Sequence, residues 1–312
     1  MDEIAHLVAI RSIIILANPR AGSFSRRKVE GIASILRRHG LQVEICYTKQ
    51  SGEISRIVEE RCAEVDAIAI HGGDGSINEA IAGLHRRRGR RPVLIVIPGG
   101  TADVLANELD LPVAATRIAQ SIINGKTLPL HYGLANGRPF FLMASAGFDA
   151  AVVYAISPGL KQVMGKFAFV VAAVRLVFRE KLPDVLVEAE GQTIRCRLAI
   201  VTNSACYGGG YLISPDNSVI RPGLRLIALT DDNFLALLRA GWRVITGRVE
   251  DGAEFFVRSI TTVRLAGDRP VLVQIDGEAF GTTPVELEPV AEALRIVVAQ
   301  GSAAKRLAGR SQ

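Results

Sequence analysis

Short apolar segments alternate with helix-like segments over the first 130 residues of the chain. Four segments have the apolar or alternating pattern of a β-strand, namely 12–17, 42–47, 67–70 and 93–97. Apolar residues at helical spacing predict helices between them, at about 23–38 with Ser23 as the N-cap, 54–63, 77–84 and a further one after residue 101. This alternation predicts a doubly wound α/β domain, in which helices cover both faces of a parallel sheet.

Residues 130–287 have a different pattern, which predicts a second, β-rich antiparallel domain. Short strand-like segments separated by Gly, Pro and Asn or Asp occur at 184–190, 193–202, 224–229, 260–265 and 271–275. Helical patterns interrupt them at about 161–178 and 233–245. Because 293–299 is again strand-like, we expect the tail, about 288–305, to return to the first domain, which then comprises 1–129 and this tail.

The composition indicates a folded protein with a basic surface. Hydrophobic residues make up 49% and charged residues 22% of the chain, and the net charge is +6 at pH 7. A basic chain favours anionic partners such as nucleotide phosphates, nucleic acid or an anionic membrane. Aromatic residues, which base-stacking platforms need, are only 5%, so we expect no nucleic-acid partner.

The cysteines, the histidines and the apolar stretches indicate where in the cell the protein is expected and whether it binds a metal through these residues. The four cysteines form no C-x-x-C pair and the five histidines show no metal-ligand spacing. The N-terminus lacks the basic and apolar regions of a signal peptide. The most apolar stretch, 163–178, contains Lys166 and Arg175 and is too short to span a bilayer. We therefore expect a cytoplasmic protein whose contact with membranes is peripheral.

Three loops with phosphate-binding character follow the predicted strands of the first domain. They are Asn18–Gly22 (NPRAG), Gly72–Gly75 (GGDG) and Pro98–Thr101 (PGGT). Ligands of open α/β sheets bind outside the carboxyl ends of the strands, so we expect the loops to converge there. Glycines let the backbone approach a ligand, and the start of the next helix offers N–H groups to phosphate. The carboxylate of Asp74 in such a loop predicts a nearby Mg²⁺, because only a cation would offset its charge.

The loops and several later motifs together resemble the diacylglycerol kinase catalytic-domain family, which includes bacterial lipid kinases and sphingosine and ceramide kinases. The family motifs NP-x-[AS]-G, GGDGT-x-NE-x-x-x-GL and P-x-GT-x-N-D are similar to Asn18–Gly22, Gly72–Leu84 (with Ser76 for Thr) and Pro98–Val104. Later family motifs are similar to 146–149 (AGFD), 207–215 (YGGGYLISP) and 276–278 (DGE). The motifs occur in the family's order and cover nearly the whole chain.

This resemblance implies a lipid kinase that binds ATP and Mg²⁺ in a cleft between its two domains and phosphorylates the hydroxyl of a long-chain lipid. It implies that Asp74 organises the phosphates and the metal, directly or through water, and that Glu278 is the general base. The ATP-binding residues that it implies are Asn18, Pro19, Arg20, Ala21, Gly22, Thr48, Gly72, Gly73, Asp74, Gly75, Ser76, Asn78, Gly100 and Thr101.

Some positions depart from the family pattern or fit a purely structural interpretation. The family's Asn-Asp pair is Asp103-Val104 here, and Pro222 stands where some members have an Asp that holds a second metal. We therefore predict no structural Mg²⁺ at Pro222. On their own, Asp276–Glu278 are typical of a hairpin turn, and Asn78-Glu79 are equally consistent with the start of a helix.

Two stretches also have both a structural and a functional interpretation. The run Arg86–Arg91 (RRRGRR) is the densest charge in the chain. It serves either as a solvated connection between a helix and a strand or as a docking surface for anionic lipid headgroups. The apolar stretch 163–178 belongs either to the core or to a cleft for an acyl chain.

Two other functions stay open. A small-molecule kinase similar to NAD kinase would share the GGDG loop, although Asn78-Glu79 and 207–210 argue against it. A catalytically silent nucleotide- or lipid-binding module would account for Asp103-Val104. Diacylglycerol, ceramide and a sphingoid base all fit as the acceptor, and no motif distinguishes them. The oligomeric state is also not determined by the sequence, and a homodimer stays open.

Overall fold

The computed structural model describes residues 6–87, 89–156, 172, 175–176, 183–231 and 234–299. The chain divides into two compact units. One unit comprises the chain up to Leu130 together with the chain from Glu292 onward, and the other is His131–Ala291. The predicted helix at 161–178 lies outside the described residues except at isolated positions, so both interpretations of its apolar stretch stay predictions.

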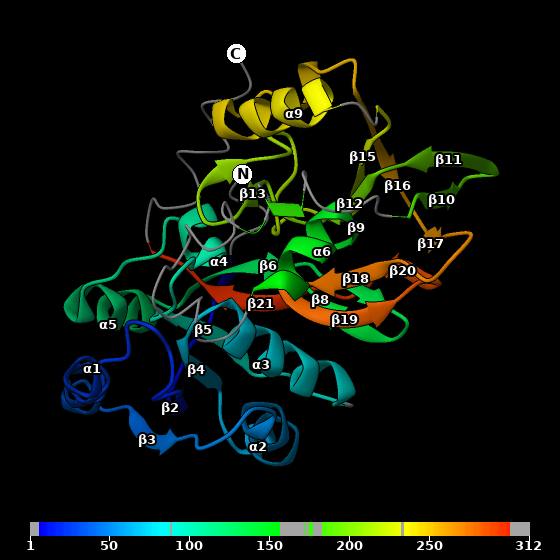
Figure 1. Cartoon of the computed structure of the whole chain (residues 1–312). Coiled ribbons are helices and arrows are strands. Elements are labelled where there is room, and N and C mark those ends of the chain that lie inside the picture. Colours follow the sequence, from blue (N-terminus) through cyan, green and yellow to red (C-terminus); the bar gives the residue numbers. More distant parts are fainter. Residues whose placement is uncertain are drawn as a thin grey trace. The chain divides into compact units, whose positions relative to one another are not determined.

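The first unit is built on a seven-stranded sheet with the order β1-β6-β21-β5-β4-β2-β3 (Figure 1). Its strands are β1 (His6–Leu7), β2 (Ser12–Ala17), β3 (Gln42–Tyr47), β4 (Ala67–Gly72), β5 (Val93–Pro98), β6 (Lys126–Leu130) and β21 (Leu294–Val297). β2, β3, β4, β5 and β21 run parallel to one another, whereas β6 is antiparallel to β21 and β1 is antiparallel to β6. The tail of the chain therefore enters this sheet as a strand between β5 and β6.

Helices cover both faces of this sheet, which confirms the predicted doubly wound α/β arrangement (Figure 1). They are α1 (Arg26–Arg38), α2 (Glu53–Arg61), α3 (Asp74–Arg86), α4 (Val104–Glu108) and α5 (Ala115–Asn124), with a 3₁₀ turn at Cys62–Glu64. α1 and α5 pack together on one face, where Ile32 and Ile118 join buried strand residues such as Ile15. α2 and α3 pack together on the other face.

Ser25 caps α1, so the predicted cap at Ser23 is wrong. The Ser25 hydroxyl accepts the N–H of Lys28 at 3.2 Å. Ser23 instead donates its N–H to the Gly99 carbonyl at 2.9 Å and its hydroxyl to the Gly100 carbonyl at 3.3 Å. Both serines have the chemistry of an N-cap. The contact with the loop after β5, which a local pattern does not encode, decides between them.

The second unit contains two six-stranded antiparallel sheets and a small hairpin. The first sheet, in the order β11-β10-β17-β20-β7-β8, contains β7 (Gly133–Ala135), β8 (Arg138–Phe140), β10 (Val185–Ala189), β11 (Gln192–Cys196), β17 (Val263–Ala266) and β20 (Val285–Pro289). The second, in the order β16-β15-β12-β9-β18-β19, contains β9 (Met143–Gly147), β12 (Leu198–Thr202), β15 (Leu224–Leu229), β16 (Phe255–Ile260), β18 (Leu272–Ile275) and β19 (Glu278–Thr282).

Buried residues of both sheets form one core, so the two sheets make a sandwich. Val187 and Leu287 come from the first sheet, and Ala146 and Val273 come from the second. The other elements that the structure describes in this unit are the hairpin β13 (Cys206–Tyr207) and β14 (Tyr211–Leu212), the helices α6 (Phe148–Ala155) and α9 (Phe234–Thr246), and a 3₁₀ turn at Val249–Asp251. Among the helices that the structure describes, none is long and apolar enough to cross a bilayer.

Two of the strands predicted for this unit each span a change of sheet. The predicted strand 193–202 is β11 followed by β12, and the break falls at Arg197, whose N–H bonds to the Leu229 carbonyl at 2.9 Å. The predicted strand 260–265 covers the end of β16 and most of β17. The other three predicted strands correspond to β10, β15 and β18. An apolar pattern continues through a change of sheet because both sheets bury side chains in the same core.

Candidate active site

The loops that follow β2, β4 and β5 meet at one edge of the seven-stranded sheet. These strands are parallel neighbours in the order β5-β4-β2, so their carboxyl ends lie side by side. Backbone hydrogen bonds join the loops, from Asn18 N–H to the His71 carbonyl at 2.9 Å and from Gly99 N–H to the Gly72 carbonyl at 3.2 Å. The sheet edge therefore brings the three glycine-containing loops together.

Close packing between these loops requires glycine at several positions. A Cβ atom on Gly100 would lie 2.5 Å from the Gly73 Cα, and a Cβ atom on Gly22 would lie 2.7 Å from Thr101 Oγ1. Both distances are too short for non-bonded atoms. The glycines therefore let the loops touch one another, in addition to letting the backbone approach a ligand.

The N-terminal end of α3 lies at this loop cluster, directly after the glycines that follow β4. Gly73 is the N-cap with an extended backbone, and Ser76 and Ile77 bond back to its carbonyl at 3.0 and 3.2 Å. The N–H groups at the very start of a helix have no acceptor within the helix, and the helix dipole is positive there. This end of α3 is therefore suited to a phosphate group.

The predicted ATP-binding residues differ in exposure. Exposed at the loop surface are Pro19, Arg20, Gly22 and Thr101. Partly exposed are Asn18, Ala21, Gly73, Asp74, Gly75 and Gly100. Buried are Thr48, Gly72, Ser76 and Asn78. The buried side chains support the loops: Thr48 Oγ1 donates to the Ala17 carbonyl at 3.4 Å, and Asn18 Nδ2 donates to Ser76 Oγ at 3.1 Å.

The carboxylate of Asp74 caps helix α4. Its Oδ2 accepts the N–H of Val104 at 3.0 Å and its Oδ1 accepts the N–H of Leu105 at 3.3 Å. The expectation that only a cation would offset the charge of Asp74 is therefore wrong, because the positive N-terminal end of α4 stabilises the same charge. Asp74 links the start of α3 to the start of α4.

Asp103 shapes the loop after β5. Its backbone is left-handed, with φ +46°, and its Oδ1 accepts the N–H of Gly100 at 2.9 Å. Burial raises the pKa of Asp103, and the Gly100 N–H and the positive charge of Lys28 oppose that rise. Lys28 also donates to the Pro98 carbonyl at 3.3 Å. The Asp that replaces the family's Asn thus has a structural partner in this chain.

The imidazole of His71 is fully buried and joins three elements, although no sequence pattern predicted a role for it. Nδ1 lies 3.1 Å from the Ile97 carbonyl, and Nε2 accepts the N–H of Ser25 at 3.2 Å. This pairing requires a neutral ring with its proton on Nδ1. Burial lowers the pKa of His71, which favours the same neutral form. The one sequence feature that could have indicated this role is the position of His71, a polar residue at the end of an apolar, buried strand.

The DGE segment of the second unit is the hairpin turn between β18 and β19, as the structural interpretation predicted. Asp276 and Gly277 occupy the two turn positions with φ +48° and +81°, which an Asp-Gly pair adopts readily. The Asp276 carboxylate accepts the N–H groups of Phe141, Leu142 and Met143 at 3.0, 2.9 and 3.0 Å. Its oxygens are therefore committed to the backbone.

Glu278, in contrast, is an accessible carboxylate. It is the first residue of β19, which is an edge strand of its sheet. Its side chain is 57% exposed, and its Oε2 lies 3.8 Å from the guanidinium of Arg138. Of the two carboxylates in the DGE segment, Glu278 is the one that is exposed to solvent.

A buried polar network supports this hairpin and joins three of the later motifs. The carboxylate of Asp149 accepts hydrogen bonds from Ser145 Oγ at 2.5 Å, from Gln274 Nε2 at 2.9 Å and from the hydroxyl of Tyr207. Gln274 Oε1 in turn accepts the N–H of Gly277 at 2.8 Å. Burial and the charge of Asp149 raise the pKa of Tyr207 well above its usual value, so its hydroxyl stays a donor.

Comparisons with known proteins place this architecture in a family. The fold is an α/β domain with glycine-containing loops at the carboxyl ends of its strands, followed by an antiparallel sandwich. Residues 12–135 match the family model described as "Diacylglycerol kinase catalytic domain", and residues 143–298 match "YegS C-terminal NAD kinase beta sandwich-like domain". The chain belongs to the family of diacylglycerol kinases and YegS-like lipid kinases, which confirms the resemblance of its motifs.

Relatives match nearly the whole chain. A diacylglycerol kinase of Bacillus subtilis (strain 168) is 25% identical over 91% of this chain and 95% of its own length. A diacylglycerol kinase of Staphylococcus carnosus (strain TM300) is 24% identical over 86% and 89%. The crystal structure of a diacylglycerol kinase from Bacillus anthracis str. Sterne superimposes with a TM-score of 0.78 at 21% identity, covering 93% of this chain and 98% of that one. The solved structure thus has the same fold.

Proposed function

We propose that this chain transfers the γ-phosphoryl group of ATP to a hydroxyl group of a long-chain lipid. Membership of a kinase family supports a phosphotransferase, and the names of the two relatives make diacylglycerol the first acceptor to test. The observation that carries the proposal is the meeting of three glycine-containing loops at the N-terminus of α3. Phosphoryl transfer depends mainly on positioning and charge stabilisation, which such a cluster provides.

The loop cluster fits the phosphates of a nucleotide. Because Gly73 carries no side chain, a phosphate can approach the backbone at the start of α3 closely. The N–H of Gly100 is already donated to Asp103 Oδ1 at 2.9 Å, so Gly100 contributes room rather than a donor. The exposed side chains of Arg20 and Thr101 add a positive charge and a hydroxyl at the rim. In this proposal the protein binds the phosphates largely through backbone groups and one helix dipole.

Magnesium is proposed to bind together with the ATP phosphates. Within the described ranges, no group of three or more His, Cys, Asp or Glu side chains is arranged to hold a metal. Magnesium usually keeps several waters and takes one or two carboxylates plus substrate phosphates, so such a cage is not required. Both oxygens of Asp74 already accept N–H groups of α4, which favours contact through water over direct ligation. Bound Mg²⁺ would offset the charge on the phosphates.

Glu278 is proposed as the general base for the lipid hydroxyl. Its exposure supports this role, and the three backbone hydrogen bonds of Asp276 argue against the neighbouring carboxylate. A general base must lie within hydrogen-bond distance of the hydroxyl whose proton it accepts. In this proposal, Gln274 and the turn at Gly277 hold the start of β19 in place while Glu278 accepts that proton.

Peripheral membrane binding is proposed from the net charge of +6 rather than from the run Arg86–Arg91 alone. Carboxylates neutralise part of this run, in the pairs Arg86–Glu59 (2.7 Å), Arg90–Asp66 (2.8 Å) and Arg91–Glu292 (3.3 Å). Co-sedimentation with vesicles, with and without anionic lipid and at low and high salt, tests the idea. Equal binding to neutral and anionic vesicles would reject it, because screened surface electrostatics requires a dependence on both.

The proposed function is tested with ATP radiolabelled on its γ-phosphate. The protein is incubated with diacylglycerol, ceramide, a sphingoid base and NAD in separate reactions. Label in the organic-soluble product of one lipid supports the proposal and names the acceptor. Label in NADP would support an NAD-kinase-like activity, and no transfer to any acceptor would support a catalytically silent binding module.

A further inference from the structure

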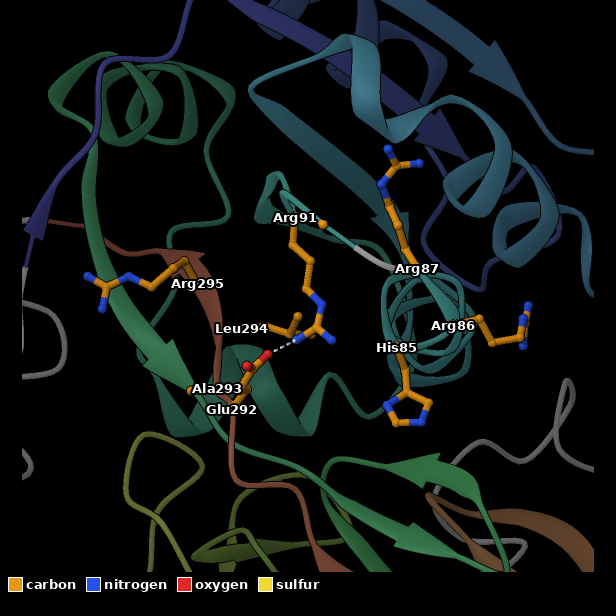
Figure 2. Close-up of a pocket in the computed structure, with 9 residues that line it drawn as sticks. His85, Arg86, Arg87, Arg91, Glu292, Ala293, Leu294 and Arg295 are labelled. Carbon is orange, nitrogen blue, oxygen red and sulfur yellow. Dashed lines mark hydrogen bonds and ion pairs between the residues drawn. The ribbon is translucent and has the colours of Figure 1, made fainter.

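A cavity of about 680 Å³ lies at the C-terminal end of α3 in the first unit (Figure 2). Its lining includes His85, Arg86, Arg87, Arg91, Glu292 and Arg295. α3 has 13 residues and a length of about 20 Å, and the glycine-containing loops lie at its other end. The cavity is therefore distinct from the candidate active site.

Cations outnumber carboxylates in the lining of this cavity. Among the described lining residues, four arginines accompany a single carboxylate, Glu292, and His85 is also present. Arg86 pairs with Glu59, which does not line the cavity. In the part of the chain that the structure describes, no carboxylate lies within ion-pair distance of Arg87 or Arg295. Their hydrogen bonds go to neutral groups, namely backbone carbonyls and one threonine.

Arg91 is the cation best placed to receive a ligand. In Figure 2, Arg91 and Glu292 reach toward one another, whereas Arg87 and Arg295 point away from them. The Arg91 side chain is 23% exposed, but its partner Glu292 is 81% exposed and lies 3.3 Å away. Exposed ion pairs contribute little to stability, so this carboxylate is readily displaced. Glu292 thus marks the place where another anion would bind.

His85 adds a second group at the same end of the helix. It lies in the last turn of α3, and burial lowers its pKa, as do the positive charges of Arg91 and Arg86. An anion bound at Arg91 would offset those charges. A bound anion would therefore oppose the lowering of the His85 pKa.

We propose that this cavity binds the phosphate monoester group of an anionic ligand, which replaces the carboxylate of Glu292 on Arg91. Such a group carries close to two negative charges at neutral pH and three acceptor oxygens. Guanidinium groups match phosphate with paired N–H donors. The volume exceeds that of a phosphate and leaves room for the group that it esterifies. The proposal does not depend on the proposed kinase activity, because it concerns a separate site.

The test measures the affinity of the full chain for glycerol 3-phosphate by isothermal titration calorimetry. A non-hydrolysable ATP analogue is added at saturation, so that binding at the glycine-containing loops does not contribute. Arg91→Gln should weaken binding at least about tenfold, as expected for a lost charge-assisted contact. Glu292→Gln should strengthen it about two- to fivefold, because a competing carboxylate is removed. Arg90→Gln is the matched control and should have no effect, since Arg90 pairs with Asp66 and does not line the cavity.

Equal affinities of Arg91→Gln and Arg90→Gln for glycerol 3-phosphate would overturn the proposal. If Arg91→Gln does not fold, the exposed Glu292→Gln variant decides: stronger binding supports the site, and unchanged binding overturns it.

Phosphatidylcholine vesicles with and without phosphatidic acid identify the source of the phosphate group. Vesicle binding that requires phosphatidic acid and Arg91, and that glycerol 3-phosphate inhibits, identifies a lipid headgroup. Binding of glycerol 3-phosphate without such vesicle binding identifies a soluble ester. Either result supports the cavity as a phosphate site, and no binding in both arms overturns it.

Discussion

Replacing Asp74 with Asn separates two roles of one carboxylate. Asp74 accepts the N–H groups of Val104 and Leu105 at 3.0 and 3.3 Å, and we propose that it also organises the phosphates of ATP. An Asn side chain keeps one acceptor oxygen, but its NH₂ group cannot accept a hydrogen bond. The variant therefore loses the charge and one of the two bonds to α4.

The expected loss of stability follows from these contacts. A hydrogen bond to a charged acceptor contributes about 1.5–3 kcal/mol. The lost charge at the helix terminus adds only about 0.3 kcal/mol, at the low end of its range, because α4 has 5 residues. A total of about 2–3 kcal/mol lowers Tm by about 4–12 °C in a unit of this size. The protein should still fold, because domains are stable by about 5–15 kcal/mol.

Asp66→Asn is the matched control for this loss of stability. Asp66 accepts the N–H groups of Arg11 and Ser12 at 2.9 and 3.1 Å, at the amino end of β2 and away from the glycine-containing loops. Scanning calorimetry gives Tm, and label transfer is then measured well below both transitions. We expect Asp66→Asn to lower Tm to a similar extent and to change the rate less than about twofold. Asp74→Asn should lower the rate about 100-fold or more.

Three results would refute this reasoning. An unchanged Tm in Asp74→Asn would show that the bonds to α4 contribute nothing. A near-normal rate at saturating Mg·ATP would show that the carboxylate is only structural. An equal loss of rate in Asp66→Asn would attribute the effect to instability rather than to the phosphates.

Three further variants test the second unit and the sheet edge. Glu278→Gln should lower kcat about 10²–10⁴-fold and leave the KM for ATP unchanged. Glu288→Gln, at an exposed control position, should leave kcat unchanged. Steady-state kinetics measures both, and a retained kcat in Glu278→Gln would show that Glu278 is not the base. Tyr207→Phe should lower the free energy of unfolding in urea by about 1–3 kcal/mol, because a buried carboxylate loses a donor. Tyr211→Phe, at a residue that is 46% exposed, should cost less than about 0.5 kcal/mol, and equal losses would contradict the network. Because the folded pKa of His71 lies below its unfolded value near 6.5, the stability that depends on the neutral ring is complete above about pH 6.5 and declines as the pH falls toward the folded pKa. The free energy of unfolding is measured in urea at several pH values below about 6.5. His71→Gln should reduce its slope against pH by up to about 1.4 kcal/mol per pH unit, and an unchanged slope would show that the ring is not held neutral.

Strands β2 to β5 of the first unit could be predicted closely, because each one is short, has an apolar or alternating pattern and is followed by loop residues, whereas β1 and β6 were not predicted. β2 ends where Asn18 and Pro19 begin, and β5 ends at the glycines of its loop. Local sequence could not distinguish Ser23 from Ser25 as the cap of α1, since a contact with Gly99 decides. It also could not show the change of sheet at Arg197, where the apolar pattern continues.

In the candidate site too, local motifs could be predicted from the sequence, but contacts between residues far apart in the chain could not. Glycines after strands form a recognisable local pattern and pointed to the three loops, whereas only the resemblance to the family pointed to Glu278. The partners of the carboxylates were not predictable. Asp74 bonds to residues 30 and 31 positions away, and Asp149 bonds to Gln274 across 125 positions. Such contacts depend on how the sheets assemble, which no short pattern records.

The position of β21 has a consequence for how the chain is made. β21 lies between β5 and β6, although the whole second unit, His131–Ala291, separates it from β6 in the sequence. A ribosome therefore releases β5 and β6 long before the strand that pairs with both of them. Until residues 294–297 emerge, the edges of β5 and β6 that pair with β21 in the folded protein have unpaired backbone groups. The N-terminal unit, although translated first, is the last to complete its sheet, and a nascent chain that stops before β21 is exposed to aggregation.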